Sequence, residues 1–87
     1  MNDNNSDKVT VGAKLENNKY TFYKGAKIYG NIGKTNYFEV IEFYEEVAKH
    51  SLIKCNQVSL NNNTSKITEV DASALHFMAT TFGCAKQ

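Results

Sequence analysis

The residues best suited to catalysis are a serine and a histidine near the end of the sequence. Ser73 and His76 are three positions apart, a spacing that places two side chains next to each other on a helix. A serine nucleophile also needs a group that orients its base and a preorganised site for the oxyanion, and the sequence specifies neither. We therefore interpret Ser73 as a helix cap and His76 as an exposed or interface residue, and we expect no enzyme activity.

The two cysteines, Cys55 and Cys84, are far apart in the sequence, and neither belongs to a Cys-x-x-Cys pair. Together with His50 and His76 they match no spacing that is typical of a metal site. We interpret both as reduced thiols of a cytosolic protein, and we expect neither a metal nor a cofactor. A disulfide between them is compatible with the sequence, but no feature favours it.

The segment 30–35 ends in Gly-Lys-Thr, as a phosphate-binding loop does. Such a loop needs another glycine five residues before the glycine of that ending, and Ile28 occupies this position. We therefore interpret the segment as a strand-to-helix loop, in which Gly30 and Gly33 permit positive φ angles.

The composition argues against several classes of protein. The chain has 87 residues and a net charge of +1, and its ten basic residues are all lysine. We expect no nucleic-acid partner, because such proteins usually carry a basic stripe, often with arginine. No stretch approaches the roughly 20 apolar residues of a membrane span, and the polar N-terminus has no apolar signal segment. We expect a disordered tail over 1–7, one domain over 8–87, no membrane insertion and a cytoplasmic location.

The first part of this domain has the alternation of β-strands. Apolar and polar residues alternate over 8–16, and the aromatic, β-favouring run 20–23 follows after Asn17-Asn18. Asparagine tolerates positive φ, so this pair predicts a tight turn and a hairpin. Gly25 could mark a bulge, and 27–29 continues the second strand or forms a third.

The next segment has helical spacing. Apolar residues recur at i, i+3, i+4 and i+7, namely Tyr37, Val40, Ile41, Tyr44, Val47 and Ala48. Asn36 and Glu39 form a pattern like a capping box, and the spacing predicts a helix over 37–49. We interpret Glu39, Glu42, Glu45 and Glu46 as its solvated face rather than as carboxylates for acid–base chemistry. His50 is expected to end this helix.

The last part predicts a strand over 55–60, a loop over 61–65 and a second helix. Ile67 and Val70 return toward the core, Asp71 or Ser73 caps the helix, and Gly83 ends it. The apolar stripe of this helix is Leu75, Met78, Ala79 and Phe82. A helical crossover between strands implies parallel pairing. The predicted class is mixed α/β (α+β): a small mixed sheet with two helices on one face.

The run Val70-Asp71-Ala72-Ser73-Ala74-Leu75 resembles the signature of STAS domains, in which an apolar residue, an aspartate, small residues and a leucine open a helix. The resemblance covers about residues 9–87, with Gly25 at the family's glycine and 37–49 as its first helix. Regulatory members carry a phosphorylatable residue directly after the aspartate. Here Ala72 stands at that position and Ser73 follows it. A typical member also continues into a further strand and helix, so this resembles a shortened member.

The resemblance implies a protein-interaction module, most like the small STAS subunits that support the ATPase of Mla-type phospholipid transporters. Such a subunit would lie peripheral to the inner membrane through the transporter complex. One alternative is an anti-sigma-factor antagonist that is phosphorylated at Ser73, and another is a small phage or mobile-element inhibitor of a host protein. The partner-binding residues that we expect are Asp71, Ala72, Ser73, His76 and Phe77, with Asn62 and Thr64 of the loop beside them. A partner or a second copy, giving a homodimer, would complete the open sheet.

Overall fold

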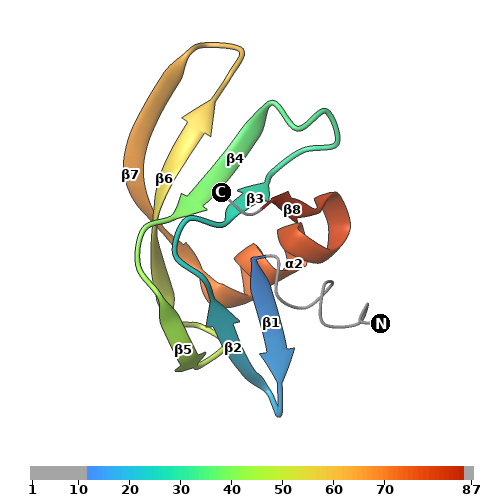
Figure 1. The fold of residues 1–87 in the computed structure, drawn as a ribbon, viewed down its shortest axis with the longest axis vertical. Helices are drawn as coiled ribbons and strands as arrows, with labels where there is room; N and C mark the ends of the chain where they lie inside the picture. Colours follow the sequence, from blue (N-terminus) through green and yellow to red (C-terminus); the bar gives the residue numbers. More distant parts are fainter. Residues whose placement is uncertain (1–11, 86–87) are drawn as a thin grey trace.

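The computed structural model describes residues 12–85 (Figure 1). Within this range the fold is mixed α+β and small, as predicted, and it contains one helix and two antiparallel sheets. The predicted tail over 1–7 and the first residues of the predicted strand 8–16 lie outside the described residues. The elements are β1 (Ala13–Glu16), β2 (Lys19–Phe22), β3 (Lys27–Tyr29), β4 (Asn36–Val40), β5 (Tyr44–Val47), β6 (Leu52–Ser59), β7 (Thr64–Asp71), α2 (Ala72–Phe82) and β8 (Cys84–Ala85).

The strands form a three-stranded sheet in the order β1-β2-β5 and a five-stranded sheet in the order β7-β6-β4-β3-β8. Each of these strand pairs is antiparallel, so the predicted parallel pairing is wrong. The prediction of two helices on one face is also wrong for residues 12–85, where α2 is the single helix. The cause of both errors is the segment that was expected to be the crossover helix.

That segment, 37–49, is extended rather than helical. All of its apolar residues except Ala48 are aromatic or β-branched, which favours strands: Tyr37, Phe38, Val40, Ile41, Phe43, Tyr44 and Val47. In β4, Phe38 and Val40 pack in or against the core, whereas alternate residues face the other side of the sheet. The helical spacing arose because residues 41–43 separate two short strands and shift the alternation between them.

The predicted hairpin at the start of the domain is confirmed. β1 and β2 pair antiparallel with Glu16 opposite Lys19, and the two residues between them are Asn17 and Asn18. Both asparagines have positive φ angles, of 53° and 64°, as the turn requires. Gly25 also has a positive φ, of 86°, but it lies in the turn between β2 and β3 rather than in a bulged strand.

The core lies between the two sheets and α2. Its fully buried large side chains come from several elements: Phe22, Ile28, Ile53, Leu75, Val40 and Cys55. Leu75 anchors α2 against this core, and Met78 and Ala79 pack beside it, which confirms three residues of the predicted stripe. Val70 also packs against the core, but Ile67 does not, because its side chain is 61% exposed.

α2 begins and ends where the sequence indicates. Asp71 is its N-cap, and Gly83 follows its last residue with a φ of 96°. The N–H of Gly83 donates to the carbonyl of Ala79, which satisfies one of the free carbonyl groups at the end of the helix. Since β7 leads directly into α2, the N-cap fixes the position of the helix relative to the outermost strand of the large sheet (Figure 1).

Candidate functional site

The carboxylate of Asp71 lies where β7 meets α2, and three donors converge on it. Its Oδ1 accepts from the backbone N–H of Ser73 at 2.9 Å and from the Ser73 hydroxyl at 2.6 Å. Its Oδ2 lies 3.0 Å from Nδ1 of His50, which must carry a proton because an ionised carboxylate only accepts. Hydrogen bonds from these three donors lower the pKa of Asp71 from 3.8 to about 2. The bond from the Ser73 hydroxyl has the largest effect, followed by those from His50 and from the Ser73 backbone N–H.

The pairing of β6 with β7 explains why His50 reaches this site. Leu52 lies opposite Asp71, so the turn before β6 places His50 beside the start of α2. His50 was expected to end a helix, and its contact with Asp71 was missed. The signal that could have revealed it is a hairpin running from residue 52 to residue 71, because hairpin pairing brings the residues before one strand near those after the other.

The order of these groups differs from that of a catalytic relay. In a serine nucleophile site the imidazole lies between the hydroxyl and the carboxylate. Here Asp71 lies in the middle, and the Ser73 hydroxyl donates to the carboxylate rather than to a base. A phosphate on Ser73 would therefore sit against a carboxylate and disrupt the cap by repulsion. The geometry makes Asp71 a helix cap with its charge held in the ionised form.

The other predicted partner-binding residues near Asp71 differ in exposure. Ala72 is fully buried, so its side chain cannot contact a partner, because it packs in the core at the start of the helix. His76 is partly buried and its ring meets Tyr20 edge-on at 5.2 Å, and burial lowers its pKa below 6.5. Phe77 is 62% exposed, so its ring presents a large apolar surface on this helix.

Asn62 and Thr64 were expected to lie beside Asp71, and this prediction is wrong. They lie at the opposite end of β7, and an eight-residue strand separates its ends by about 23 Å. The two residues line a polar groove of about 620 Å³ on the side of the sheet that faces Met78 of α2. Gln57 and Lys66 extend its polar lining. The structure therefore divides the predicted contact surface into two groups, joined by β7.

The exposed edge of β7 links these two groups. β7 ends the five-stranded sheet, and within residues 12–85 its one strand neighbour is β6 (Figure 1). Two bonds show which of its peptide groups face outward. The carbonyl of Lys54 accepts from Ile41, so this residue of β6 faces β4, and the N–H of Ala72 donates to Ser51, so residue 72 faces β6.

N–H and C=O groups alternate sides along a strand. The even-numbered residues of β7 therefore bond to β6, and Ser65, Ile67 and Glu69 direct their backbone groups away from it. These three side chains also share one face of the sheet. Sequence reasoning expected an open strand edge but did not locate it on β7.

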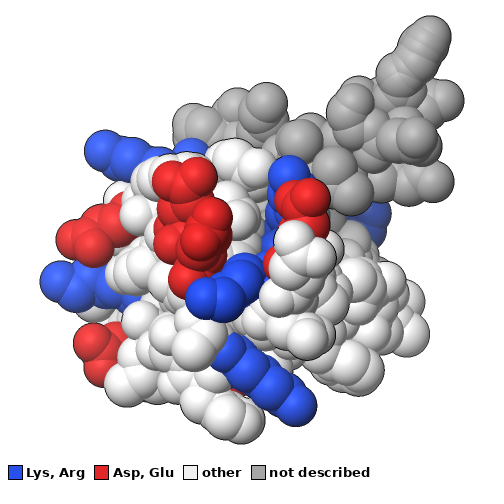
Figure 2. Space-filling model, turned by 90° about the horizontal axis from the view of Figure 1, so that it is seen from below, with Lys and Arg blue, Asp and Glu red and all other residues white. Residues whose placement is uncertain are grey.

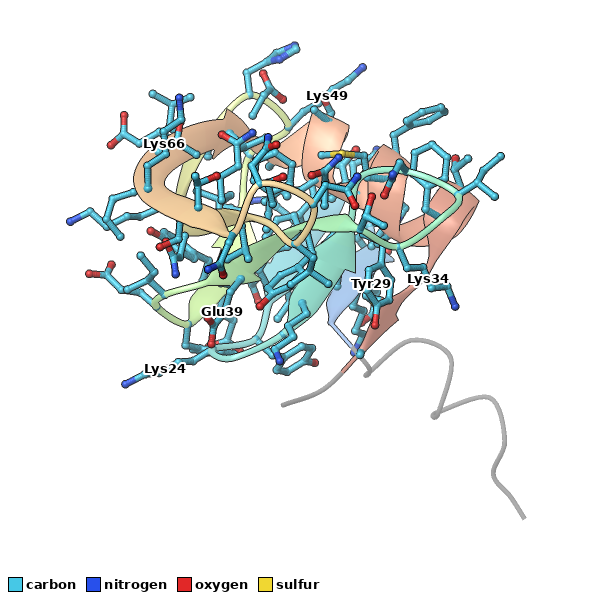
Figure 3. All side chains as sticks on the ribbon, turned by 90° about the horizontal axis from the view of Figure 1, so that it is seen from above. Lys24, Tyr29, Lys34, Glu39, Lys49 and Lys66 are labelled. Carbon is cyan, nitrogen blue, oxygen red and sulfur yellow. The ribbon has the colours of Figure 1, made fainter. Side chains whose placement is uncertain are left out.

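An apolar groove of about 640 Å³ adjoins this face. In the sheet register Ile67 lies opposite Asn56, which lies opposite Glu39, and all three line the groove. Lys24 lies at the other end of it, and Figure 3 shows Lys24 and Glu39 close together on one side of the molecule. The groove thus extends the exposed apolar surface of Ile67 across the sheet.

The Gly-Lys-Thr loop is not arranged to hold a phosphate. Oδ1 of Asn31 accepts from the N–H groups of Thr35 and Asn36, so a side chain already occupies donors that an anion would need. The ammonium of Lys34 lies 5.2 Å from the ring centre of Tyr29, and the two are neighbours in Figure 3. This supports the interpretation of the segment as a connecting loop, although it joins two strands.

Cys55 and Cys84 are free thiols, and burial raises the pKa of both, that of Cys55 to about 12. Residues 12–85 contain no group of three or more His, Cys, Asp or Glu side chains that could hold a metal ion. Over the same range, no helix is both long and apolar enough to cross a membrane.

On the face shown in Figure 2, acidic side chains gather among lysines. One pocket of mixed charge is lined by Lys14, Glu16, Lys19, Glu45 and Glu46. Among the described side chains on this face, lysines alternate with acidic residues and form no continuous basic stripe of the kind that favours a nucleic-acid backbone.

No family model matches this sequence, and no curated protein or solved structure is significantly similar to it.

Proposed function

We propose that the chain is a protein-binding module that accepts an extended strand of a protein partner along the edge of β7. The observation that carries this proposal is the outward direction of the backbone groups of Ser65, Ile67 and Glu69 at the end of the sheet. Strand addition satisfies such groups with main-chain hydrogen bonds, while alternate side chains supply specificity. The proposal includes no catalytic step, which agrees with the use of Ser73 and Asp71 as a cap.

The side chains of β7 define the partner strand. On the groove side, Ile67 favours a large apolar side chain opposite it, and Glu69 favours a basic one. On the other side of the sheet, the exposed Lys66 favours an acidic residue. The preferred partner is therefore an extended segment with one apolar position between charged ones, rather than a helix.

The resemblance to STAS domains now depends on 70–75, because the segment matched to the first helix of that family forms β4 and β5. We retain the ATPase of a phospholipid transporter as the first named partner to test, in the cytoplasm beside the inner membrane. The anti-sigma kinase requires phosphorylation of Ser73, which the bond from its hydroxyl to Asp71 disfavours. A host-protein partner of a phage inhibitor could use the same edge.

Two proline substitutions test this proposal. Ile67→Pro removes an N–H that faces outward, so the sheet should persist while an added strand loses a hydrogen bond. Thr68→Pro removes an N–H that bonds to β6 and should destabilise the fold, which checks the assigned direction of the backbone groups. The tagged wild type should capture a partner ATPase in native-cell lysate and folded Ile67→Pro should not, whereas Ile32→Ala on a remote loop should capture it normally. Equal capture by folded Ile67→Pro would exclude the β7 edge as the binding site.

A further inference from the structure

We infer that β7 also pairs antiparallel with β7 of a second copy, with Ile67 opposite Ile67 of that copy, so that a dimer covers the partner-binding edge. This inference rests on the proposed function, because it uses the same edge. It adds a regulatory property: the dimer and the complex with a partner strand are mutually exclusive.

Symmetry limits the possible registers. Two copies joined edge to edge by antiparallel strands are related by a two-fold axis perpendicular to the sheet, so outward-facing residues pair with outward-facing residues. The axis must therefore pass between the two copies of one residue of β7, so that this residue lies opposite the same residue of the second copy. In the register centred on Ile67, three residues of each chain, Ser65, Ile67 and Glu69, donate and accept across the interface.

Repulsion between like charges disfavours two of the neighbouring registers. A register centred on Lys66 or on Glu69 places like charges directly opposite each other, which is destabilising. A register centred on Thr68 places each Ile67 opposite Glu69 of the other copy, so a carboxylate would lie against an apolar side chain.

The register centred on Ile67 avoids these contacts. It places Glu69 opposite Ser65 and Lys66 opposite Thr68, and it brings together two isoleucine side chains that are each 61% exposed in the single chain. The two Lys66 side chains lie diagonally across the interface, where their exposed ends can reach solvent. A single added strand pair forms a small interface, so the dimer should be weak and reversible.

The inference is tested by sedimentation equilibrium of the full chain at concentrations up to about 1 mM, the range of a weak complex. The wild type should form a reversible dimer. Ile67→Lys should lower the association constant at least tenfold, because the introduced ammonium groups would face each other. In the register centred on Thr68 the same substitution would face Glu69 and raise association. Ile32→Lys is the matched control, because Ile32 is 85% exposed on the β3–β4 loop and should leave association unchanged.

Three results would overturn the inference: a wild type that stays monomeric at every concentration, a folded Ile67→Lys that associates as well as the wild type or better, or a folded Ile67→Pro that dimerises normally. The proposed function fails separately. If the wild type stays monomeric but still captures its partner, and folded Ile67→Pro loses this capture, then the dimer is excluded and the proposed binding function stands.

Discussion

Ile67 lies opposite Asn56 across the β6–β7 pair, with its backbone N–H and C=O directed away from β6 and its side chain 61% exposed. The residues on either side of it, Lys66 and Thr68, bond to β6. One strand thus closes the sheet with half of its peptide groups and directs the other half outward. The cap at Asp71 fixes one end of this edge, and the loop with Asn62 lies at the other.

Acid should weaken the fold through Asp71. Its pKa in the folded chain lies below 3.8, so its ionised form stabilises the fold above that pH, and this contribution is lost as the pH falls toward about 2. Asp71→Asn keeps an oxygen for the Ser73 N–H but cannot ionise. Urea unfolding at several pH values should show lower stability for Asp71→Asn near neutral pH and a smaller loss of stability between pH 3.8 and 2. Equal acid-induced losses in both proteins would contradict the assigned charge.

The core should depend on Leu75 far more than on an exposed leucine. Leu75→Ala removes a fully buried side chain and should lower the free energy of unfolding by about 2–5 kcal/mol. Leu52→Ala is the control, because Leu52 is 58% exposed and should change stability by about 0.5 kcal/mol or less. Both values can be measured by denaturant unfolding, and similar losses would show that α2 does not pack as described.

The end of α2 should require glycine. Gly83 has a φ of 96° and a ψ of 170°, and a Cβ there would meet no atom within 4 Å, so the cost of substitution is backbone strain alone. Gly83→Ala should lower the unfolding free energy by about 1–3 kcal/mol. Gly33→Ala, where a Cβ makes only ordinary contacts at 3.9 Å, should be close to neutral. A neutral Gly83→Ala would mean that the helix ends with a different backbone conformation.

The thiol of Cys55 should be unreactive in the folded chain. Burial raises its pKa to about 12 and leaves no exposed surface, so little thiolate forms and reagents cannot reach it. Mass spectrometry after iodoacetamide treatment at mildly alkaline pH should find Cys55 unmodified, and full modification should follow in urea. Cys55→Ala identifies the contribution of Cys84 in the same assay. Rapid labelling of Cys55 without urea would show that β6 is not buried as described.

Local features of the fold could be predicted from the sequence, and those that depend on distant residues could not. The turn at Asn17 and Asn18, the cap at Asp71 and the stop at Gly83 follow from backbone preferences of single residues, and each is confirmed. The helix predicted over 37–49 rested on the spacing of its apolar residues and on the capping pattern of Asn36 and Glu39, and both signals are local. Strand formation there is favoured by its aromatic and β-branched residues and by pairing with β3 and β6, which no local pattern reveals.

Within the candidate site, too, the contact between nearby residues could be predicted and the contacts between distant residues could not. Ser73 and Asp71 are two residues apart in the sequence, so their contact could be anticipated from helix capping. The contact of His50 with Asp71 and the open edge at Ile67 both arise from the long β6–β7 hairpin. The distance of Asn62 from Asp71 has the same origin, because β7 extends between them.

Amide hydrogen exchange of β7, followed by NMR, tests whether the outward backbone groups of this strand are free and bind a partner strand. In dilute protein the amides of Ser65, Ile67 and Glu69 should exchange fast, while those of Lys66 and Thr68 are protected by β6. Addition of the purified partner should protect the three outward amides and leave the other two unchanged. Binding along the β7 edge is contradicted if those three amides are already protected in the dilute monomer, or if a bound partner protects α2 or the polar groove and leaves them exchanging fast.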